Sequence, residues 1–164
     1  MPPRLRNHVH LMPSILDRLL DDAPGDTTES PTVRFQTIQQ LKDAVTRDLE
    51  SLLNTRQEAW DGLRLESEEL QHSLMAYGLP DFTAYSLLNA HDRQRIRLAI
   101  EQTIAAFEPR MLHVRVTLTP PRESDRTLRF SIEALLRLEP APEPVVFDAI
   151  LQLNTHNYVV HGRD

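Results

Sequence analysis

Cysteine is absent from this 164-residue chain, so it has neither a disulfide framework nor thiol chemistry. This absence permits a cytosolic location without proving one. No apolar run approaches the roughly 20 residues that span a bilayer, and nothing after Arg4 and Arg6 resembles a signal peptide. The four glycines lie far apart, which excludes a glycine-rich phosphate loop. We therefore expect a protein without membrane insertion or nucleotide-binding motifs.

Lysine is almost absent as well, since only Lys42 among the 18 Lys and Arg residues is a lysine. Arginine suits planar contacts with carboxylates and is enriched at protein interfaces, although codon bias in a GC-rich genome is the larger cause of this imbalance. The net charge of −6 argues against a general nucleic-acid binder. Hydrophobic residues make up 40% of the chain, which is enough for one ordinary core.

Residues 1–31 are predicted to form a mobile N-terminal arm, with a short helix capped by Ser14 and a flexible linker from Asp21 to Pro31. Residues 32–164 are predicted to form a single domain. Its first helix is expected from Thr32 to Leu53, because apolar residues recur there at spacings of three and four. These apolar positions are Ile38, Leu41, Val45, Leu49, Leu52 and Leu53.

Two further helices are predicted before the chain changes its pattern. The first runs from Ser67 to Tyr77, where Gly78 suits a left-handed C-cap and Pro80 acts as a stop. The second follows Asn89, a good N-cap residue. Its apolar stripe consists of Ile96, Ile100, Ile104 and Phe107.

Three arginines, Arg93, Arg95 and Arg97, crowd the first turns of this last helix. Positive charge at a helix N-terminus opposes the helix dipole. Residues that break a local rule often mark a functional site, so Arg93 and Arg97 are candidate interface residues. Simple exposure to solvent is the competing interpretation.

After Arg110 the apolar period changes from 3.6 to 2, which indicates strands. The alternation predicts strands over residues 112–118 and 128–138, a third strand from Val145 to Leu153, and a brief pairing of residues 158–160. The prolines between Glu139 and Pro144 are expected to break the sheet. The predicted fold class is therefore α+β, with N-terminal helices followed by a small C-terminal antiparallel sheet of three to four strands.

Phe107-Glu108-Pro109-Arg110 lies where the last helix gives way to the first strand. Proline cannot continue the helix and pushes Glu108 toward an extended backbone. From the residues alone, the simplest interpretation is a structural stop in which Arg110 complements the helix C-terminus.

Three segments in order resemble the baseplate wedge family of contractile tails. They are Leu53-Asn54-Thr55-Arg56, Tyr77-Gly78-Leu79-Pro80-Asp81-Phe82 and Phe107-Glu108-Pro109-Arg110. The chain is most similar to the TssE baseplate subunits of type VI secretion, relatives of a phage wedge protein often called lysozyme-like. The resemblance runs from about Pro13 to about Val160. One departure is Gln57, where the family often has a second arginine.

The resemblance implies a structural wedge subunit without enzymatic activity or cofactor. Its expected partner-binding residues are Glu108, Pro109 and Arg110, which would reach out from the corner to a core bundle of neighbouring wedge subunits. A sheet edge, supplied by Val145–Leu153 or Tyr158–Val160, would accept strands from the first ring of sheath subunits. The inner tube or spike is a further candidate partner. The implied location is cytoplasmic, on the cytoplasmic side of the inner membrane through the assembled complex.

The enzymatic alternative is a peptidoglycan-cleaving glycosidase, which needs two carboxylates about 5 to 10 Å apart. Glu139 and Asp148 have the nine-residue spacing of phage lysozymes, but chance gives about one such pair in this composition. Glu108 with an Asp that the sequence does not identify is the other candidate pair. No metal site is predicted, because His8 and His10 lie in the arm, and His156 and His161 have no carboxylate at a useful spacing. An adaptor with unrelated partners is the third interpretation.

Overall fold

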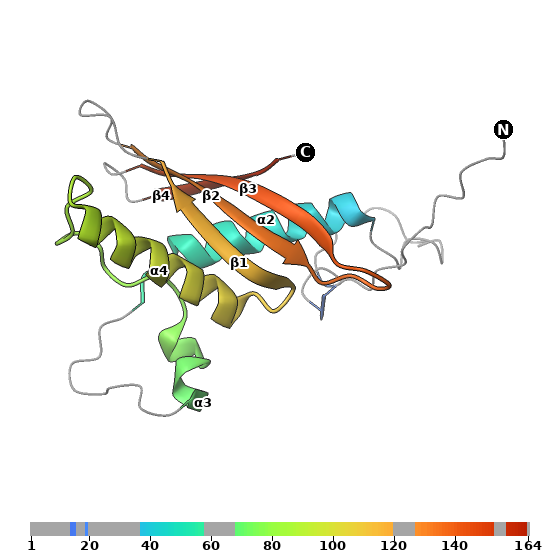
Figure 1. Cartoon of the computed structure of the whole chain (residues 1–164). Helices are drawn as coiled ribbons and strands as arrows, with labels where there is room; N and C mark the ends of the chain where they lie inside the picture. Colours follow the sequence, from blue (N-terminus) through green and yellow to red (C-terminus); the bar gives the residue numbers. More distant parts are fainter. Residues whose placement is uncertain are drawn as a thin grey trace, which may run out of the picture. The chain divides into compact units, whose positions relative to one another are not determined.

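The computed structural model describes residues 14, 15, 19, 37–57, 68–119, 127–152 and 157–163 (Figure 1). The chain forms two compact units, Met1–Val45 and Thr46–Asp164. The predicted boundary between residues 31 and 32 lies outside the described residues, so that division stays a prediction. The described elements are α2 (Ile38–Asn54), α3 (Glu68–Gln71), the 3-10 helix η2 (Leu74–Ala76), α4 (Ala90–Phe107), β1 (Met111–Leu118), β2 (Thr127–Leu136), β3 (Glu143–Gln152) and β4 (Asn157–Arg163).

α2 begins with a capping box. The Gln40 N–H donates to Thr37 Oγ1 at 3.2 Å, and the Thr37 N–H donates to Gln40 Oε1 at 2.8 Å. Residues 32–36, the predicted start of this helix, lie outside the described residues. The predicted apolar stripe is confirmed as a buried face, with Leu41, Val45, Leu49, Leu52 and Leu53 all at most 8% exposed.

The helix predicted from Ser67 to Tyr77 is divided into α3 and η2, so the prediction of one continuous helix was wrong. Ser73 stands between the two pieces in an extended conformation. Its hydroxyl donates to Leu70 O at 2.8 Å and accepts from the Met75 N–H at 3.3 Å. A serine side chain that bonds to the nearby backbone competes with helical hydrogen bonding, which explains the break.

α4 has the predicted N-cap, since Asn89 Oδ1 accepts from the His91 N–H at 2.8 Å. The predicted stripe is buried at Ile96, Ile100 and Ile104. Phe107 is only partly buried, and its ring packs edge-on against Tyr77 with 5.2 Å between centroids. Within the residues that the structure describes, no helix is long and apolar enough to cross a bilayer.

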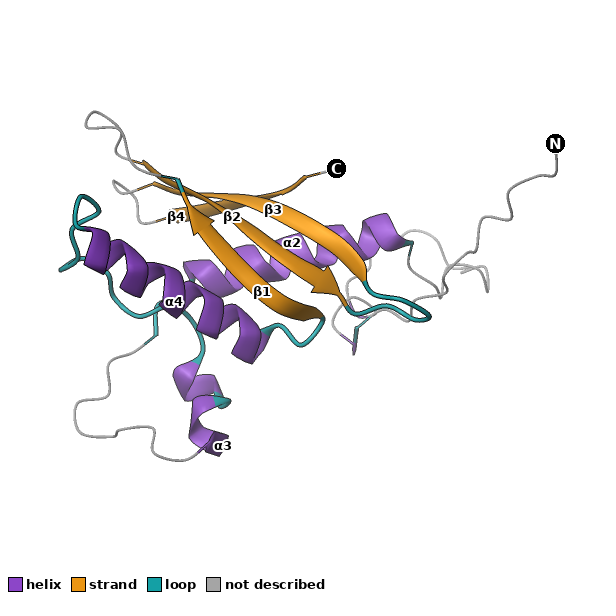
Figure 2. Cartoon of the chain, in the orientation of Figure 1, coloured by secondary structure: helices purple, strands orange, loops and turns teal. Residues whose placement is uncertain are grey.

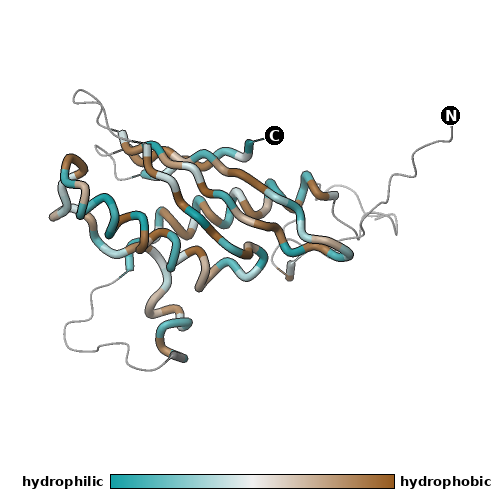
Figure 3. Tube along the Cα trace, in the orientation of Figure 1, coloured by the Kyte–Doolittle hydropathy of each residue, from teal (hydrophilic) through white to brown (hydrophobic). Residues whose placement is uncertain are grey.

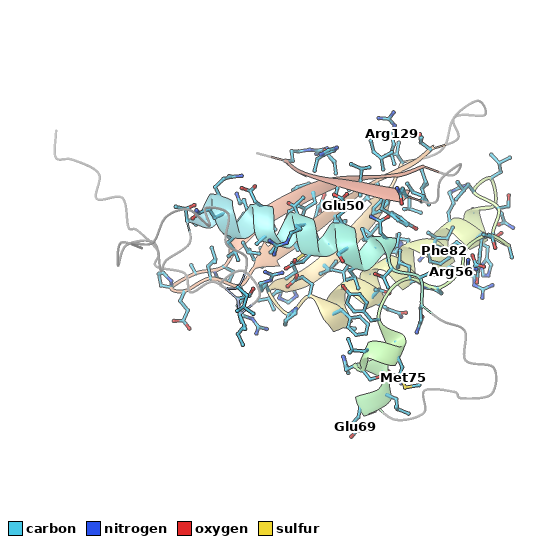
Figure 4. The ribbon with its side chains drawn as sticks, turned by 180° about the vertical axis from the view of Figure 1, so that it is seen from behind. Glu50, Arg56, Glu69, Met75, Phe82 and Arg129 are labelled. Carbon is cyan, nitrogen blue, oxygen red and sulfur yellow. The ribbon has the colours of Figure 1, made fainter. Side chains whose placement is uncertain are left out.

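The four strands form one antiparallel sheet in the order β1-β2-β3-β4, which confirms the α+β class. Hydrophobic and hydrophilic residues alternate along the strands (Figure 3). Within Thr46–Asp164, α4 lies against one face of the sheet beside β1 (Figure 1, Figure 2). The opposite face carries exposed polar side chains such as Arg129 (Figure 4). One face is thus buried and the other meets solvent or a partner.

Two details of the sheet differ from expectation. Pro144 was expected to lie in the segment that breaks the sheet, but it is the second residue of β3. Pairing with β4 extends only to Val146, so Pro144 lies at an edge position that tolerates a missing N–H. The segment Val145–Leu153 was also a candidate sheet edge, and this was wrong, because β3 lies between β2 and β4.

Candidate functional site

The candidate site is the corner between α4 and β1. Glu108 ends the helix, and its N–H donates to Ile104 O at 2.8 Å. Pro109 is exposed at the turn. Arg110 then leads into β1, and its carbonyl accepts from the Arg137 N–H at 2.8 Å, just beyond the end of β2. Main-chain hydrogen bonds therefore hold the corner against both the helix and the sheet.

The resemblance suggested that the Glu108 side chain reaches out from this corner. It points inward instead. Glu108 is 4% exposed, and its carboxylate faces Arg110. Oε1 accepts from Arg110 Nε at 2.7 Å and from the Arg110 N–H at 3.1 Å, while Oε2 accepts from Nη2 at 2.5 Å. A buried carboxylate needs such charge-assisted partners to offset its lost hydration. Glu108 thus fixes the position of Arg110.

A third residue, Asp48 of α2, completes the cluster. Its Oδ2 lies 2.6 Å from Arg110 Nη2, and its Oδ1 lies 3.1 Å from Arg47 Nη2. Sequence reasoning missed Asp48 because 62 residues separate it from Arg110. A signal was present, however, because Asp48 lies three residues after Val45 and four before Leu52, in the middle of the apolar stripe.

Electrostatics keep this arginine charged. The hydrogen bonds that the Arg110 guanidinium donates to the Glu108 carboxylate are the largest influence on the pKa of Arg110 and raise it above its ordinary value, with Asp48 adding to this effect and burial opposing it. The Arg110 side chain remains 24% exposed. The corner therefore carries a partly exposed arginine side chain whose guanidinium is held by two carboxylates, and a guanidinium is a group suited to binding a carboxylate or a carbonyl oxygen.

The two candidate interface arginines of α4 both have internal partners. Arg93 Nη1 donates to the carbonyls of Leu87 and Leu88, at 2.8 and 3.0 Å. Arg97 Nη1 forms an ion pair with Glu101 at 2.6 Å. These contacts explain why positive charge is tolerated near the helix N-terminus. Their role in an interface stays a prediction.

The other two segments of the resemblance meet in space. Leu79 exchanges main-chain hydrogen bonds with the segment after α2: its N–H donates to Thr55 O, and its carbonyl accepts from the Gln57 N–H, both at 2.8 Å. Arg56 also pairs with Asp81 and is seen near Phe82 in Figure 4. Gly78 has φ +101°, and a Cβ there would lie 2.4 Å from Thr55 O. These contacts join the end of α2 to the segment that follows η2.

Both outer edges of the sheet are partly covered by side chains. On β4, Asn54 bonds to both main-chain groups of Tyr158. On β1, Glu101 Oε1 accepts from the Val116 N–H at 2.8 Å, and the register of β1 shifts between Leu112 and Arg115. Side chains that bond to the main chain of an edge strand, and bulges within that strand, both limit its pairing with strands of other protein molecules.

The glycosidase pair does not come together as an acid and a base. Glu139 is exposed in the link between β2 and β3. Asp148 lies in β3, five residues after its first residue Glu143, and so is roughly 17 Å along the strand from Glu143 at about 3.4 Å per residue. Its carboxylate is held by Arg163 at 2.6 and 2.9 Å. In the described part of the chain, no three metal-binding side chains form a cluster.

Comparison with known families agrees with the resemblance. The family model described as baseplate wedge protein gp25 matches residues 39–141, which include all of α2 except Ile38, and the whole of α4, β1, β2 and the corner between α4 and β1. No curated protein and no solved structure matches the chain. The matched region covers more than half of the chain, and the chain therefore belongs to the gp25 family of baseplate wedge proteins.

Proposed function

We propose that this chain is a structural wedge subunit of a type VI secretion baseplate, which docks on a core bundle of larger wedge subunits through Glu108, Pro109 and Arg110. The observation that carries the proposal is the corner itself, where a fixed and charged Arg110 lies partly exposed at the end of a helix. Arginine held in this way loses little side-chain entropy on binding, which favours it as an interface anchor.

A second surface is proposed at the sheet edge, where the first ring of sheath subunits would add strands. The Tyr158 N–H and carbonyl point away from β3 toward Asn54. Because the main-chain groups of every second residue in a strand point the same way, the N–H and carbonyl groups of Val160 and Gly162 also point away from β3. His161, Gly162 and Arg163 are exposed. The end of β4 beyond Asn54 is therefore the better edge for strand addition.

The proposed role needs no catalytic group or cofactor. Contact with the inner tube or spike belongs to the same proposal, as does a location on the cytoplasmic side of the inner membrane, reached through the assembled complex. A partly exposed Arg110, held in place between α4 and β1, would give the larger wedge subunits a preformed group to bind.

Affinity purification from the native cell, read by mass spectrometry, tests this function. The test variant combines Glu108→Gln with Arg110→Met and is called the neutral-corner variant; it removes both charges together, so that neither remains buried without its partner. Arg129→Glu, on the exposed sheet face, is the control for a surface change. The native chain and the control should recover the larger wedge subunits and sheath proteins.

The neutral-corner variant should lose the wedge subunits. If it recovers them as well as the native chain, the corner is not the docking site. If the native chain recovers no baseplate protein, the function itself is wrong.

A further inference from the structure

The corner contains a residue that its own sequence motif does not include. Asp48 comes from α2, yet its carboxylate lies 2.6 Å from Arg110 Nη2, compared with 2.5 Å for Glu108. Asp48 is 29% exposed at its side chain, whereas Glu108 is 5% exposed. The two carboxylates therefore hold the guanidinium differently, Glu108 from within the protein and Asp48 at its surface.

The donors of Arg110 are unequally used. Nε and Nη2 donate to Glu108, and Nη2 also donates to Asp48. Nη1 makes no hydrogen bond to the residues that the structure describes. A guanidinium has five N–H donors in a rigid fork, so two fixed nitrogens determine the direction of the third.

Charge at the surface of the cluster favours an acidic partner. The exposed part of the cluster comprises Arg47, Asp48 and Arg110, with side chains 45%, 29% and 24% exposed. Glu108 also pairs with Arg110, so the charges of the four side chains balance, but the Glu108 carboxylate is buried. The charged side chains that a partner would meet are therefore two arginines and one aspartate, in a chain with a net charge of −6.

From this geometry we propose that Asp48 is a positioning residue of the docking site, which holds Arg110 so that Nη1 receives a carboxylate of the partner protein. The inference rests on the proposed docking function. Asp48 pairs directly with Arg110 at 2.6 Å and with Arg47 at 3.1 Å, although 62 residues separate Asp48 from Arg110, so the site is built by α2 as well as by the helix–strand corner. Positioning before binding lowers the entropy lost in the complex.

Binding affinity tests the inference, with the purified larger wedge subunits of the same gene cluster as the probe. Asp48→Asn keeps the size of the side chain but removes its charge. It should weaken the affinity of the full chain by about tenfold, the scale expected when a charged hydrogen bond at an interface is loosened. Asp148→Asn is the matched control, because Asp148 also pairs with an arginine, Arg163, but on β3. It should bind like the native chain.

A double-mutant cycle separates positioning from a general effect on folding. In the neutral-corner variant, Asp48→Asn should cause no further loss of affinity, because no guanidinium remains to be held. Asp48→Glu, which restores the charge, should bind within about threefold of the native chain. Circular dichroism checks that each variant is folded, and Asp48→Glu decides the matter if Asp48→Asn unfolds.

Native affinity in Asp48→Asn would overturn the inference, as would an equal loss in the neutral-corner background or failure of Asp48→Glu to restore binding. Any of these three outcomes would still leave the docking function intact, provided that the neutral-corner variant binds the larger wedge subunits more weakly than the native chain does. If the native chain does not bind the larger wedge subunits at all, the proposed function fails first.

Discussion

Asn54 bonds to the main chain of Tyr158 in the way that a neighbouring strand would. Its Nδ2 donates to Tyr158 O at 2.9 Å, and its Oδ1 accepts from the Tyr158 N–H at 2.7 Å. The same Nδ2 donates to Glu50 O at 2.8 Å, within its own helix. One amide thus ends α2 and covers part of the β4 edge.

Asn54→Ala is expected to lower the free energy of unfolding by about 1–3 kcal/mol, because the N–H and carbonyl of Tyr158 would lose their partner in a part-buried place. Chemical denaturation followed by circular dichroism measures this. Gln102→Ala, on the exposed side of α4, is the control and should stay within about 0.5 kcal/mol of the native chain. Equal midpoints for Asn54→Ala and the native chain would show that the amide contributes nothing.

Gly78→Ala should be severely destabilising, by more than about 2 kcal/mol, since a methyl group would meet Thr55 O at 2.4 Å in a left-handed conformation. Gly162→Ala provides a matched comparison. There the nearest atom to a new Cβ is Thr46 Oγ1 at 3.8 Å, an ordinary contact. Thermal melts of the two variants should therefore differ clearly. Similar melting temperatures would mean that the approach of Gly78 to Thr55 is not a constraint.

Stability should depend on alkaline pH through Tyr158. Burial raises the pKa of Tyr158 to about 12, from 10.0 for a free side chain. Below pH 10 the hydroxyl is protonated in both states, so it adds no pH dependence. Between pH 10 and 12 the unfolded chain loses this proton while the folded protein keeps it, which lowers the free energy of unfolding by about 1.4 kcal/mol per pH unit.

Urea titrations across this range measure the slope. Tyr158→Phe should remove the contribution of this residue, leaving a shallower decline above pH 10. A variant that declines as steeply as the native chain would assign the alkaline sensitivity to other groups.

Removing one charge of the corner should cost more stability than removing both. Arg110→Ala leaves the Glu108 carboxylate buried without its partner, and we expect a loss of about 3–5 kcal/mol. The neutral-corner variant has no such orphan and should be more stable than Arg110→Ala. Denaturant midpoints compare the two. The opposite order would mean that Glu108 is not held by Arg110 in solution.

Local patterns in the sequence predicted most of the fold. The stripe of α2, the Asn89 cap and the change of period after Arg110 each depend on neighbours within one or two turns, and each is present. The division of α3 from η2 was missed because Ser73 bonds to the backbone on both sides of itself. Propensity alone does not reveal that competition.

The site was predictable only in part. The corner was visible as a proline between Glu108 and Arg110, but the inward direction of Glu108 depends on burial, which a motif does not encode. Asp48 reaches Arg110 only through folding of the chain. Its place within an apolar stripe was the available clue, because a charge there needs a partner.

The most direct test of the central claim is the affinity of the full chain for the purified larger wedge subunits of its gene cluster, measured by calorimetry. We expect the native chain to form a stoichiometric complex with these subunits. For the neutral-corner variant, once circular dichroism has shown that it is folded, we expect a Kd at least about a hundredfold higher, because an arginine anchor of the interface is lost. Equal Kd values for the two proteins would contradict the claim that the corner is the docking site.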